Sequence, residues 1–209
     1  MSGSTIAILL IGLLAAYLMG SIPTGFVLAR IVAGIDIREH GSGNTGATNV
    51  FRVVGKGAGI AALIVDLLKG VFSVLLLRWL SIRLGVDGEW LSWVLVAAGL
   101  FAVIGHSKSV WLGFSGGKSA ATGLGVLLAI AWPVGLSVAA VFGVVLAISR
   151  TVSVGSLAAA VSAMIFMWLT GQPLAYLAVA IAGGLYVILR HRSNISRLLA
   201  GTEPKTFGS

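Results

Sequence analysis

Long apolar runs constrain the fold of this chain more than any other feature of its sequence. Seven of them recur along the 209 residues, and the short segments between them hold most of the charged side chains. The chain is 58% hydrophobic and only 10% charged, whereas a soluble domain carries about a quarter charged residues. So few polar side chains cannot cover a globule of this size in water. The apolar surface is therefore expected to face hydrocarbon, as in an integral membrane protein.

The runs predict an all-α fold of about seven transmembrane helices in a single domain, residues 1–209. A helix that crosses about 30 Å of hydrocarbon needs about 20 residues, so the shorter runs must borrow loop residues or stop partway. Six crossings is therefore the alternative. The first run lacks the basic start and the cleavage site of a removed signal peptide. The predicted helices cover residues 5–27, 57–77, 91–104, 120–132, 134–148, 154–169 and 174–189.

The distribution of charge predicts the orientation of these helices. Fourteen Lys and Arg against six Asp and Glu give a net charge of +8. The basic residues gather at the ends of apolar runs rather than in one tract, which favours cytoplasmic loops over nucleic-acid binding. They follow mainly the first, third, fifth and seventh runs, whereas Asp87 and Glu89 lie on the other side. The positive-inside rule then places the N-terminus outside and the C-terminus in the cytoplasm, which also favours seven crossings.

The residues that usually hold metals are sparse. Cysteine is absent, and the three histidines, His40, His106 and His191, lie in separate segments without the spacing of a zinc-binding helix. We therefore expect neither a metal nor a bound organic cofactor.

The first basic loop carries a nine-residue stretch, residues 41–49 (GSGNTGATN), followed by Arg52. Glycines allow successive N–H groups to converge on one point, and the hydroxyl and amide side chains add neutral donors beside a fixed charge. The stretch also satisfies a dinucleotide-binding fingerprint, but that motif requires a preceding strand and here follows a membrane helix. We therefore interpret it as a phosphate-binding loop, with a flexible glycine–serine turn as the alternative.

A second loop, residues 105–122, ends in Gly116, Gly117, Lys118 and Ser119 at a predicted helix start. A helix N-terminus offers unpaired N–H groups and partial positive charge, to which Lys118 adds a full charge. A nucleotide-binding loop is disfavoured because Leu112 stands where its first glycine is required. The stretch predicts a second anion site, and the alternative is that Lys118 is an interfacial anchor.

Further polar groups lie inside or beside the apolar runs. Asp66 and Lys69 share one helical face, where they either line a site or form a structural ion pair. Serines after Arg150 and a His–Asn pair after the last run lie on the same predicted cytoplasmic side. A serine in a membrane helix more often bonds its own backbone than takes part in catalysis. The residues concerned are Ser153, Ser156, His191 and Asn194.

Five sequence blocks resemble the bacterial acyl-phosphate-dependent glycerol-3-phosphate acyltransferases, the PlsY family. The match spans nearly the whole chain, and five blocks in one order are far more specific than a single glycine motif. The family's Gly-Gly-Lys-Gly ends here in Ser119, which is expected to narrow the phosphate site. The blocks are residues 20–25 (GSIPTG), 36–49 (DIREHGSGNTGATN), 66–70 (DLLKG), 105–118 and 191–203 (HRSNISRLLAGTE).

The resemblance implies transfer of a fatty acyl group from long-chain acyl phosphate to the 1-hydroxyl of glycerol 3-phosphate. The products are lysophosphatidate and inorganic phosphate, in the first acylation step of phospholipid biosynthesis. It also implies a multi-pass protein of the bacterial cytoplasmic (inner) membrane, with its active site on the cytoplasmic face and the lipid bilayer as its partner. The oligomeric state stays open, and a monomer is compatible with the sequence.

The same resemblance assigns the site residues. Arg52 and Lys118 are expected to bind phosphates, and backbone N–H groups near Gly116 and Gly117 to stabilise the developing oxyanion. His191, or a phosphate oxygen of the substrate, is expected to accept the hydroxyl proton. The catalytic residues are Ser156, His191, Asn194 and Lys118, and the substrate-binding residues are Gly41, Ser42, Asn44, Asn49, Arg52, Gly116, Gly117 and Lys118.

A transporter for phosphorylated solutes is the competing interpretation, because small-residue helices and intramembrane charge also suit translocation. Nearly all the candidate binding groups lie on one predicted side, however. A translocation path requires polar groups at the midplane and on the outer face as well, so the asymmetry favours an enzyme.

Overall fold

The structure is a computed structural model that describes residues 2–206, and within that range every regular element is helical. A single bridge between Ser109 and Ser115 is the nearest approach to a strand among the described residues. Two short 3-10 helices, η1 and η2, interrupt the connections. The elements in order are α1 (Gly3–Ser21), α2 (Thr24–Ala33), η1 (Ile37–Glu39), α3 (Ala47–Val53), α4 (Lys56–Arg83), α5 (Gly88–Ser107), η2 (Val110–Leu112), α6 (Ala120–Ile130), α7 (Trp132–Ser149), α8 (Val152–Leu169), α9 (Leu174–Arg190) and α10 (Arg192–Leu199).

The first apolar run is not one helix. Residues 5–27 were expected to be continuous, but α1 ends at Ser21 and α2 begins at Thr24, with Ile22 and Pro23 between them. The residue before a proline is disfavoured in helical conformation, and a proline nitrogen cannot donate to the preceding turn. The Ile22 carbonyl at the break accepts from the N–H of Thr24 at 3.0 Å and from the Nζ of Lys69 on α4.

Most of the predicted spans correspond to helices long and apolar enough to cross a bilayer. Within residues 2–206 there are five such helices, counting α1 with α2, and up to six if α9 and α10 are one span bent by 58°. The exception is α6, whose 11 residues extend about 16 Å, roughly half the hydrocarbon thickness. It ends at Ile130 rather than at the predicted residue 132, because Pro133 fits the first turn of α7.

Small residues bring the central helices into close contact. A Cβ atom on Gly20 of α1 would lie 2.2 Å from the Ala102 carbonyl oxygen of α5. On α6, a Cβ atom at Gly125 would lie 2.0 Å from the Leu67 carbonyl oxygen of α4. Helices in lipid associate through such packing, since hydrocarbon provides no hydrophobic drive between them. Gly20 and Gly125 therefore act as packing residues at these two helix pairs.

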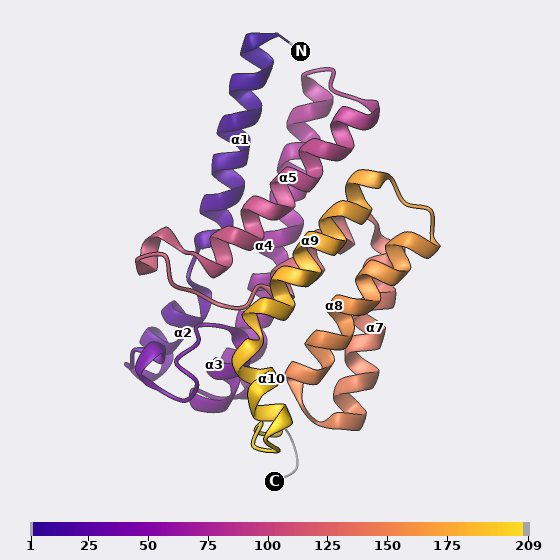
Figure 1. Cartoon of the computed structure of the whole chain (residues 1–209). Coiled ribbons are helices and arrows are strands. Elements are labelled where there is room, and N and C mark those ends of the chain that lie inside the picture. The colour runs from indigo at the N-terminus through magenta and orange to yellow at the C-terminus, as the bar shows by residue number, and fades with distance from the viewer. Residues whose placement is uncertain (1, 207–209) are drawn as a thin grey trace.

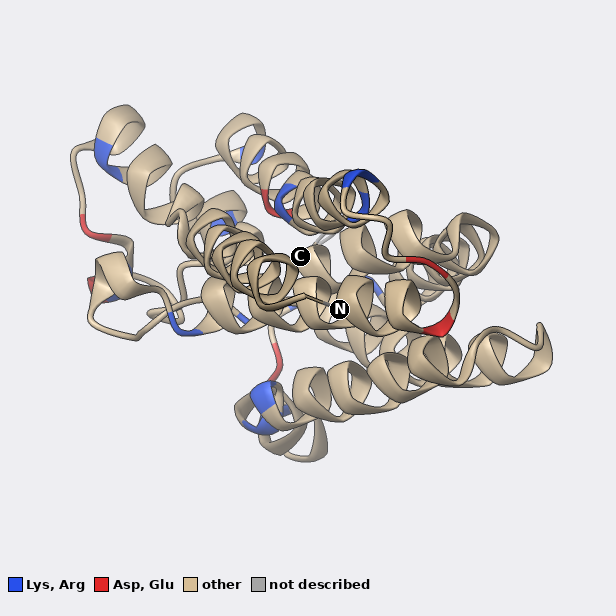
Figure 2. Ribbon diagram, turned by 90° about the horizontal axis from the view of Figure 1, so that it is seen from above, with Lys and Arg blue, Asp and Glu red and all other residues tan. Residues whose placement is uncertain are grey.

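The chain ends lie at opposite ends of the helical bundle (Figure 1). The short helices α2, α3 and α10 gather at the end where the C-terminus lies, and α7 and α8 pack beside α9. Most of the helical ribbon carries neither sign of charge (Figure 2). Two of these short helices, α3 and α10, fall in segments that the apolar runs did not identify, and both help to build the site.

Candidate active site

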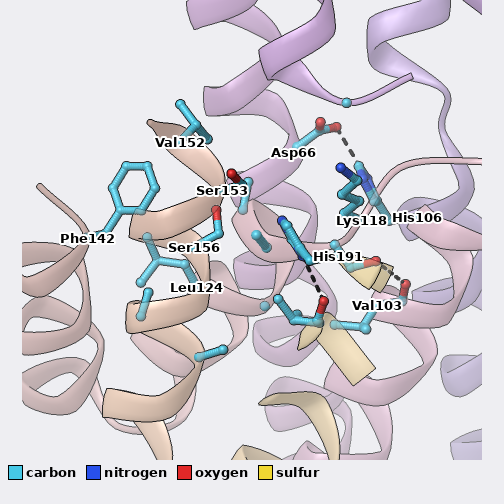
Figure 3. Close-up of a pocket in the computed structure, with 18 of the residues that line it drawn as sticks. Asp66, Val103, His106, Lys118, Leu124, Phe142, Val152, Ser153, Ser156 and His191 are labelled. Carbon is cyan, nitrogen blue, oxygen red and sulfur yellow. Dashed lines mark hydrogen bonds and ion pairs between the residues drawn. The ribbon is translucent and has the colours of Figure 1, made fainter. Parts of the chain in front are cut away.

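One pocket collects most of the residues that the sequence singled out (Figure 3). It lies between α5, α6, α8 and α9, and the α3 region and the C-terminal segment close it. Gly41, Gly116 and Gly117 are not among the residues that line it. The predicted site residues in its lining are Ser42, Asn44, Asn49, Arg52, Lys118, Ser156, His191 and Asn194.

Asn49 organises the first glycine-rich loop from within. Its Nδ2 donates to three carbonyls, those of Ile37, His40 and Asn44, at 3.3, 3.0 and 2.9 Å. Its Oδ1 accepts from the N–H of Ser42 at 3.0 Å. The Asn49 side chain is 3% exposed, so its amide serves the loop rather than solvent. The loop is thus a fixed turn rather than the flexible glycine–serine turn of the alternative interpretation.

Gly41 is required by this arrangement for two reasons. Its φ of 60° lies in the left-handed region, and a Cβ there would lie 2.4 Å from Oδ1 of Asn49. Asn44 uses its own Oδ1 to accept from Gly46 at 2.9 Å, while its Nδ2 donates to the Gly116 carbonyl at 3.4 Å. The first loop is therefore bonded directly to the second.

Gly116 and Gly117 lie against His106 rather than against an open site. A Cβ on Gly116 would lie 2.3 Å from the His106 carbonyl oxygen, and one on Gly117 would lie 2.1 Å from the His106 Nε2. The Gly117 N–H donates to the His106 carbonyl at 3.1 Å. The Gly117 N–H therefore already has an acceptor, so the donors expected near Gly116 and Gly117 would have to be neighbouring N–H groups. On the far side, Arg190 donates to the carbonyls of both glycines.

The anion-binding end of α6 lies one step further along the chain. Ala120 and Ala121 begin this helix, and the N–H groups of a first helical turn have no acceptor within the helix. Both residues line the pocket. These N–H groups, close to Gly116 and Gly117 in the chain, are thus candidates for the backbone donors that were expected in this stretch.

Ser119, which takes the place of the family glycine, lines the pocket. Its φ of 63° is left-handed, a conformation that a glycine adopts without strain. The hydroxyl donates to the Val103 carbonyl at 2.8 Å. This buried hydrogen bond holds the side chain against α5, and whether Ser119 narrows the phosphate site stays a prediction.

Lys118 extends into the pocket from the second loop and donates to Oδ1 of Asn194 on α10. Burial lowers the pKa of Lys118 from 10.5 to about 8, and three nearby arginines oppose its charge, while Glu203 favours it. A second anion beside Lys118 would raise this pKa again and so favour the charged form. The environment of this ammonium group is therefore suited to a phosphate ligand, rather than to an interfacial anchor that reaches into the lipid headgroups.

Glu203 is the site residue that sequence reasoning missed. It lies on the C-terminal segment, and its Oε1 accepts from Ser153 at 2.8 Å and from Asn194 at 2.6 Å. Its Oε2 accepts from Arg197 Nε at 2.7 Å. Burial raises the pKa of this carboxyl, but the three hydrogen bonds outweigh burial and the net pKa is lowered. The signal was present in the sequence, because an acidic residue closes the basic 191–203 block.

The C-terminal segment straps the pocket from the α3 side to the α7–α8 turn. Arg52 on α3 donates to the Pro204 carbonyl at 3.0 Å. The N–H of Thr206 donates to the Arg150 carbonyl at 2.7 Å, and its Oγ1 accepts from Val152 at 3.4 Å. Burial lowers the pKa of Arg52. Arg52 is thus held at the pocket edge with guanidinium donors left for a second acceptor.

The surroundings of His191 define its tautomer. Its Nδ1 lies 2.7 Å from the Val187 carbonyl oxygen, and a carbonyl can only accept, so the proton is on Nδ1. The neutral ring then presents Nε2 as an acceptor. The ring is 4% exposed and lines the pocket together with Ser156 (Figure 3).

Asp66 and Lys69 form a buried ion pair at 2.6 Å, and Asp66 also lies 3.6 Å from the His106 Nδ1. Both alternatives offered by the sequence hold for this pair. Lys69 bonds the Ile22 carbonyl at the α1–α2 break, whereas Asp66 lines the pocket beside His106 (Figure 3). The pair therefore connects the break between α1 and α2 to His106, the residue against which Gly117 packs.

The composition of the pocket wall changes along its length. Cations, hydroxyls and the α6 helix start surround one end, and alanine, valine and leucine side chains together with glycine backbone line the other. A ligand that fits both ends carries an anionic group on a long apolar chain.

Comparison with known proteins agrees with this description. The family model "Glycerol-3-phosphate acyltransferase" matches residues 10–201. A glycerol-3-phosphate acyltransferase of Acaryochloris marina is 51% identical over 202 residues, which cover 92% of this chain and 90% of that protein. One from Synechococcus sp. strain JA-3-3Ab is 56% identical over 196 residues, with 94% and 92% coverage.

Solved structures give the same result at the level of the fold. The crystal structure of PlsY, described as an integral membrane glycerol 3-phosphate acyltransferase in its glycerol 3-phosphate form, superimposes with a TM-score of 0.86. It is 41% identical, and the match covers 96% of each chain. The lysophosphatidic acid form of PlsY matches with a TM-score of 0.83 at 40% identity. The chain therefore belongs to the glycerol-3-phosphate acyltransferase family and is an integral membrane protein of the PlsY type.

Proposed function

We propose that this protein transfers a fatty acyl group from acyl phosphate to the 1-hydroxyl of glycerol 3-phosphate. The products are 1-acylglycerol 3-phosphate and inorganic phosphate. The observation that carries the proposal is the single pocket with a cationic end and an apolar end. Both substrates bear phosphate, and one bears a lipid tail, so such a pocket can hold them side by side.

Lys118, Arg52 and the start of α6 bind the phosphates. Lys118 and Arg52 provide charge, and the N–H groups of Ala120 and Ala121 provide oriented donors. The first loop contributes Ser42 and Asn44, and it keeps its shape through Gly41 and Asn49. Gly116 and Gly117 act indirectly, because they allow the loop that carries Lys118 to lie on His106.

The reaction needs positioning more than activation. The 1-hydroxyl oxygen forms a bond to the acyl carbon, the bond from that carbon to the phosphate oxygen breaks, and phosphate leaves with the electron pair. The hydroxyl proton passes to Nε2 of His191 or to a phosphate oxygen. Effective concentrations gained by orientation alone are worth up to about 7–11 kcal/mol, and a mixed anhydride already has a good leaving group.

Ser156 and Asn194 orient the hydroxyl against the acyl carbon. Asn194 is itself held from two sides, by Lys118 and by Glu203. The N–H groups at the start of α6 face the oxyanion that develops during attack. Glu203 is a positioning residue in this scheme, since it fixes Asn194 and Ser153.

In the membrane, we place the N-terminus outside and the pocket at the cytoplasmic face. The count of seven crossings then includes the short helix α6, which is the fourth of them in chain order. The opposite positions of the two termini and the basic residues around the pocket support this orientation (Figure 1). The protein then draws glycerol 3-phosphate from the cytoplasm of a bacterium and the acyl donor from the inner membrane.

The test is phosphate release from palmitoyl phosphate by the purified protein, measured with and without glycerol 3-phosphate. Acceptor-dependent release, lost in Arg52→Ala and in Lys118→Ala, is expected. Arg83→Ala is the matched control, because Arg83 ends α4 beyond the pocket lining. Absence of release by folded protein, with palmitoyl-CoA also inert, would exclude the proposed reaction.

A further inference from the structure

The apolar end of the pocket continues the helix faces that carry the catalytic groups. On α9, Gly183 and Val187 precede His191 at intervals of four residues, and all three line the pocket. Residues four apart lie on one face of a helix. Along this face of α9, the pocket wall therefore changes from the imidazole ring of His191 to the side-chain-free backbone of Gly183 over about two helical turns.

The opposite wall follows the same pattern on α8. Ser153 and Ser156 lie at the polar end, and Ala160 and Ala163 follow on the same face, deeper in the bundle. Ala163 is 4% exposed and belongs to the main apolar core. A chain attached to an acyl carbon beside His191 therefore extends between α8 and α9 toward this core.

Gly183 differs from the glycines that pack helices together. A Cβ built on its backbone meets no heavy atom within 4 Å among the described residues. At the neighbouring Gly184, in contrast, a Cβ would lie 2.4 Å from the Met164 methyl carbon. Helix packing explains Gly184 but not Gly183. The open space at Gly183 belongs to the pocket that it lines.

We infer that Gly183 determines which acyl chains the protein accepts, by leaving the channel open about two helical turns from His191. Eight residues of helix place it about 12 Å from His191 along α9. The carbonyl end of any acyl donor lies short of this level, and only the distal part of a long chain passes it. The inference rests on the proposed function, since it concerns the acyl donor of that reaction.

A side chain at position 183 should therefore discriminate by chain length rather than weaken the reaction as a whole. Leucine there would occupy the space of several methylene groups, and hydrophobic pockets discriminate by roughly 10–200-fold per methylene. Leucine also favours helix more than glycine does, so α9 is not weakened by the change.

The experiment compares kcat/KM for octanoyl phosphate and palmitoyl phosphate in the wild type, Gly183→Ala and Gly183→Leu. Gly143→Leu on α7 is the matched control. Its Cβ also meets nothing within 4 Å among residues 2–206, but Gly143 is exposed and does not line the pocket. For Gly183→Leu, the palmitoyl value is expected to fall about tenfold or more, with the octanoyl value within about threefold of wild type. Alanine should give an intermediate ratio, and the control should give the wild-type ratio.

Equal losses for both donors in Gly183→Leu, or no loss for either, would overturn the inference. The wild-type enzyme separates this result from a failure of the proposed function. If wild type uses palmitoyl-CoA rather than palmitoyl phosphate, the donor assignment fails. The same length series with acyl-CoA then still decides the role of Gly183.

Discussion

Substitution of Gly117 tests whether the glycine pair serves His106 or the substrate. In Gly117→Ala the new methyl group would lie 2.1 Å from His106 Nε2, whereas ordinary contact begins at 3.4 Å, so about 1.3 Å of movement is required. Overpacking of this kind costs about 1–3 kcal/mol. A displacement near 1 Å at a catalytic loop costs about 100-fold in rate. We expect kcat to fall about 100-fold and the apparent melting temperature in detergent to fall by several degrees.

Removal of the histidine ring should relieve this defect. In a His106→Ala background the methyl group enters vacated space, so Gly117→Ala should cause less than about a threefold further loss of activity. Gly116→Ala is the matched control, because its methyl group would meet the His106 backbone oxygen at 2.3 Å, which no side-chain change removes. The measurement is a double-mutant cycle on kcat and on melting temperature.

Two outcomes would refute this reasoning. One is that Gly117→Ala is as damaging with the ring absent as with it present. The other is that His106→Ala relieves Gly116→Ala to the same extent as it relieves Gly117→Ala. Either result would mean that the glycines meet the ligand or the backbone instead of the ring.

Three further changes test other contacts of the site. Because the Lys118 pKa is about 8 and its charged form binds phosphate, kcat/KM for glycerol 3-phosphate should fall as pH rises through 8. Lys118→Arg should remove that fall, and a pH profile unchanged in this variant would contradict the assignment. Asp66→Asn leaves Lys69 buried without its counter-charge and should cost about 3–5 kcal/mol, whereas Asp66→Leu with Lys69→Met should cost much less, as measured by thermal unfolding in detergent. Ser119→Gly loses one hydrogen bond worth about 1 kcal/mol and relieves about 1–2 kcal/mol of left-handed strain, so KM should stay within about twofold; a larger change would place the hydroxyl in the phosphate site.

Apolar patterning predicted the spanning helices well, because hydrocarbon requires each long run to satisfy its own backbone as a helix. The ends were less accurate. The predicted run over residues 57–77 became α4, Lys56–Arg83, since a helix continues through polar residues until a turn stops it. The short helices α3 and α10 were missed for the opposite reason. They are polar enough to leave no apolar signal, and tertiary contacts stabilise them.

The sequence predicted several of the charged and polar side chains that line the pocket. Lys118, Arg52, His191 and Asn194 line one pocket, as the family resemblance implied for these positions. The need for a glycine at position 117 was not predictable. The sequence does not reveal that the ring of His106, eleven residues earlier, packs against this position.

The connections of Glu203 were hidden for a similar reason. Only the folded chain brings its carboxylate to Ser153, fifty positions away in the sequence. Local motifs thus point to the groups that we propose bind phosphate, whereas the groups that hold them in place are contributed by distant segments.

The strap formed by the C-terminal segment bears on when the protein gains activity during synthesis. Chains are made and folded from the N-terminus, and a chain that stops after Arg190 already contains α1 to α9. It lacks His191, Asn194 and Glu203, so one wall of the pocket is missing. A nonsense or frameshift change at the codon for His191 should therefore leave a protein that enters the membrane but has no acyltransferase activity.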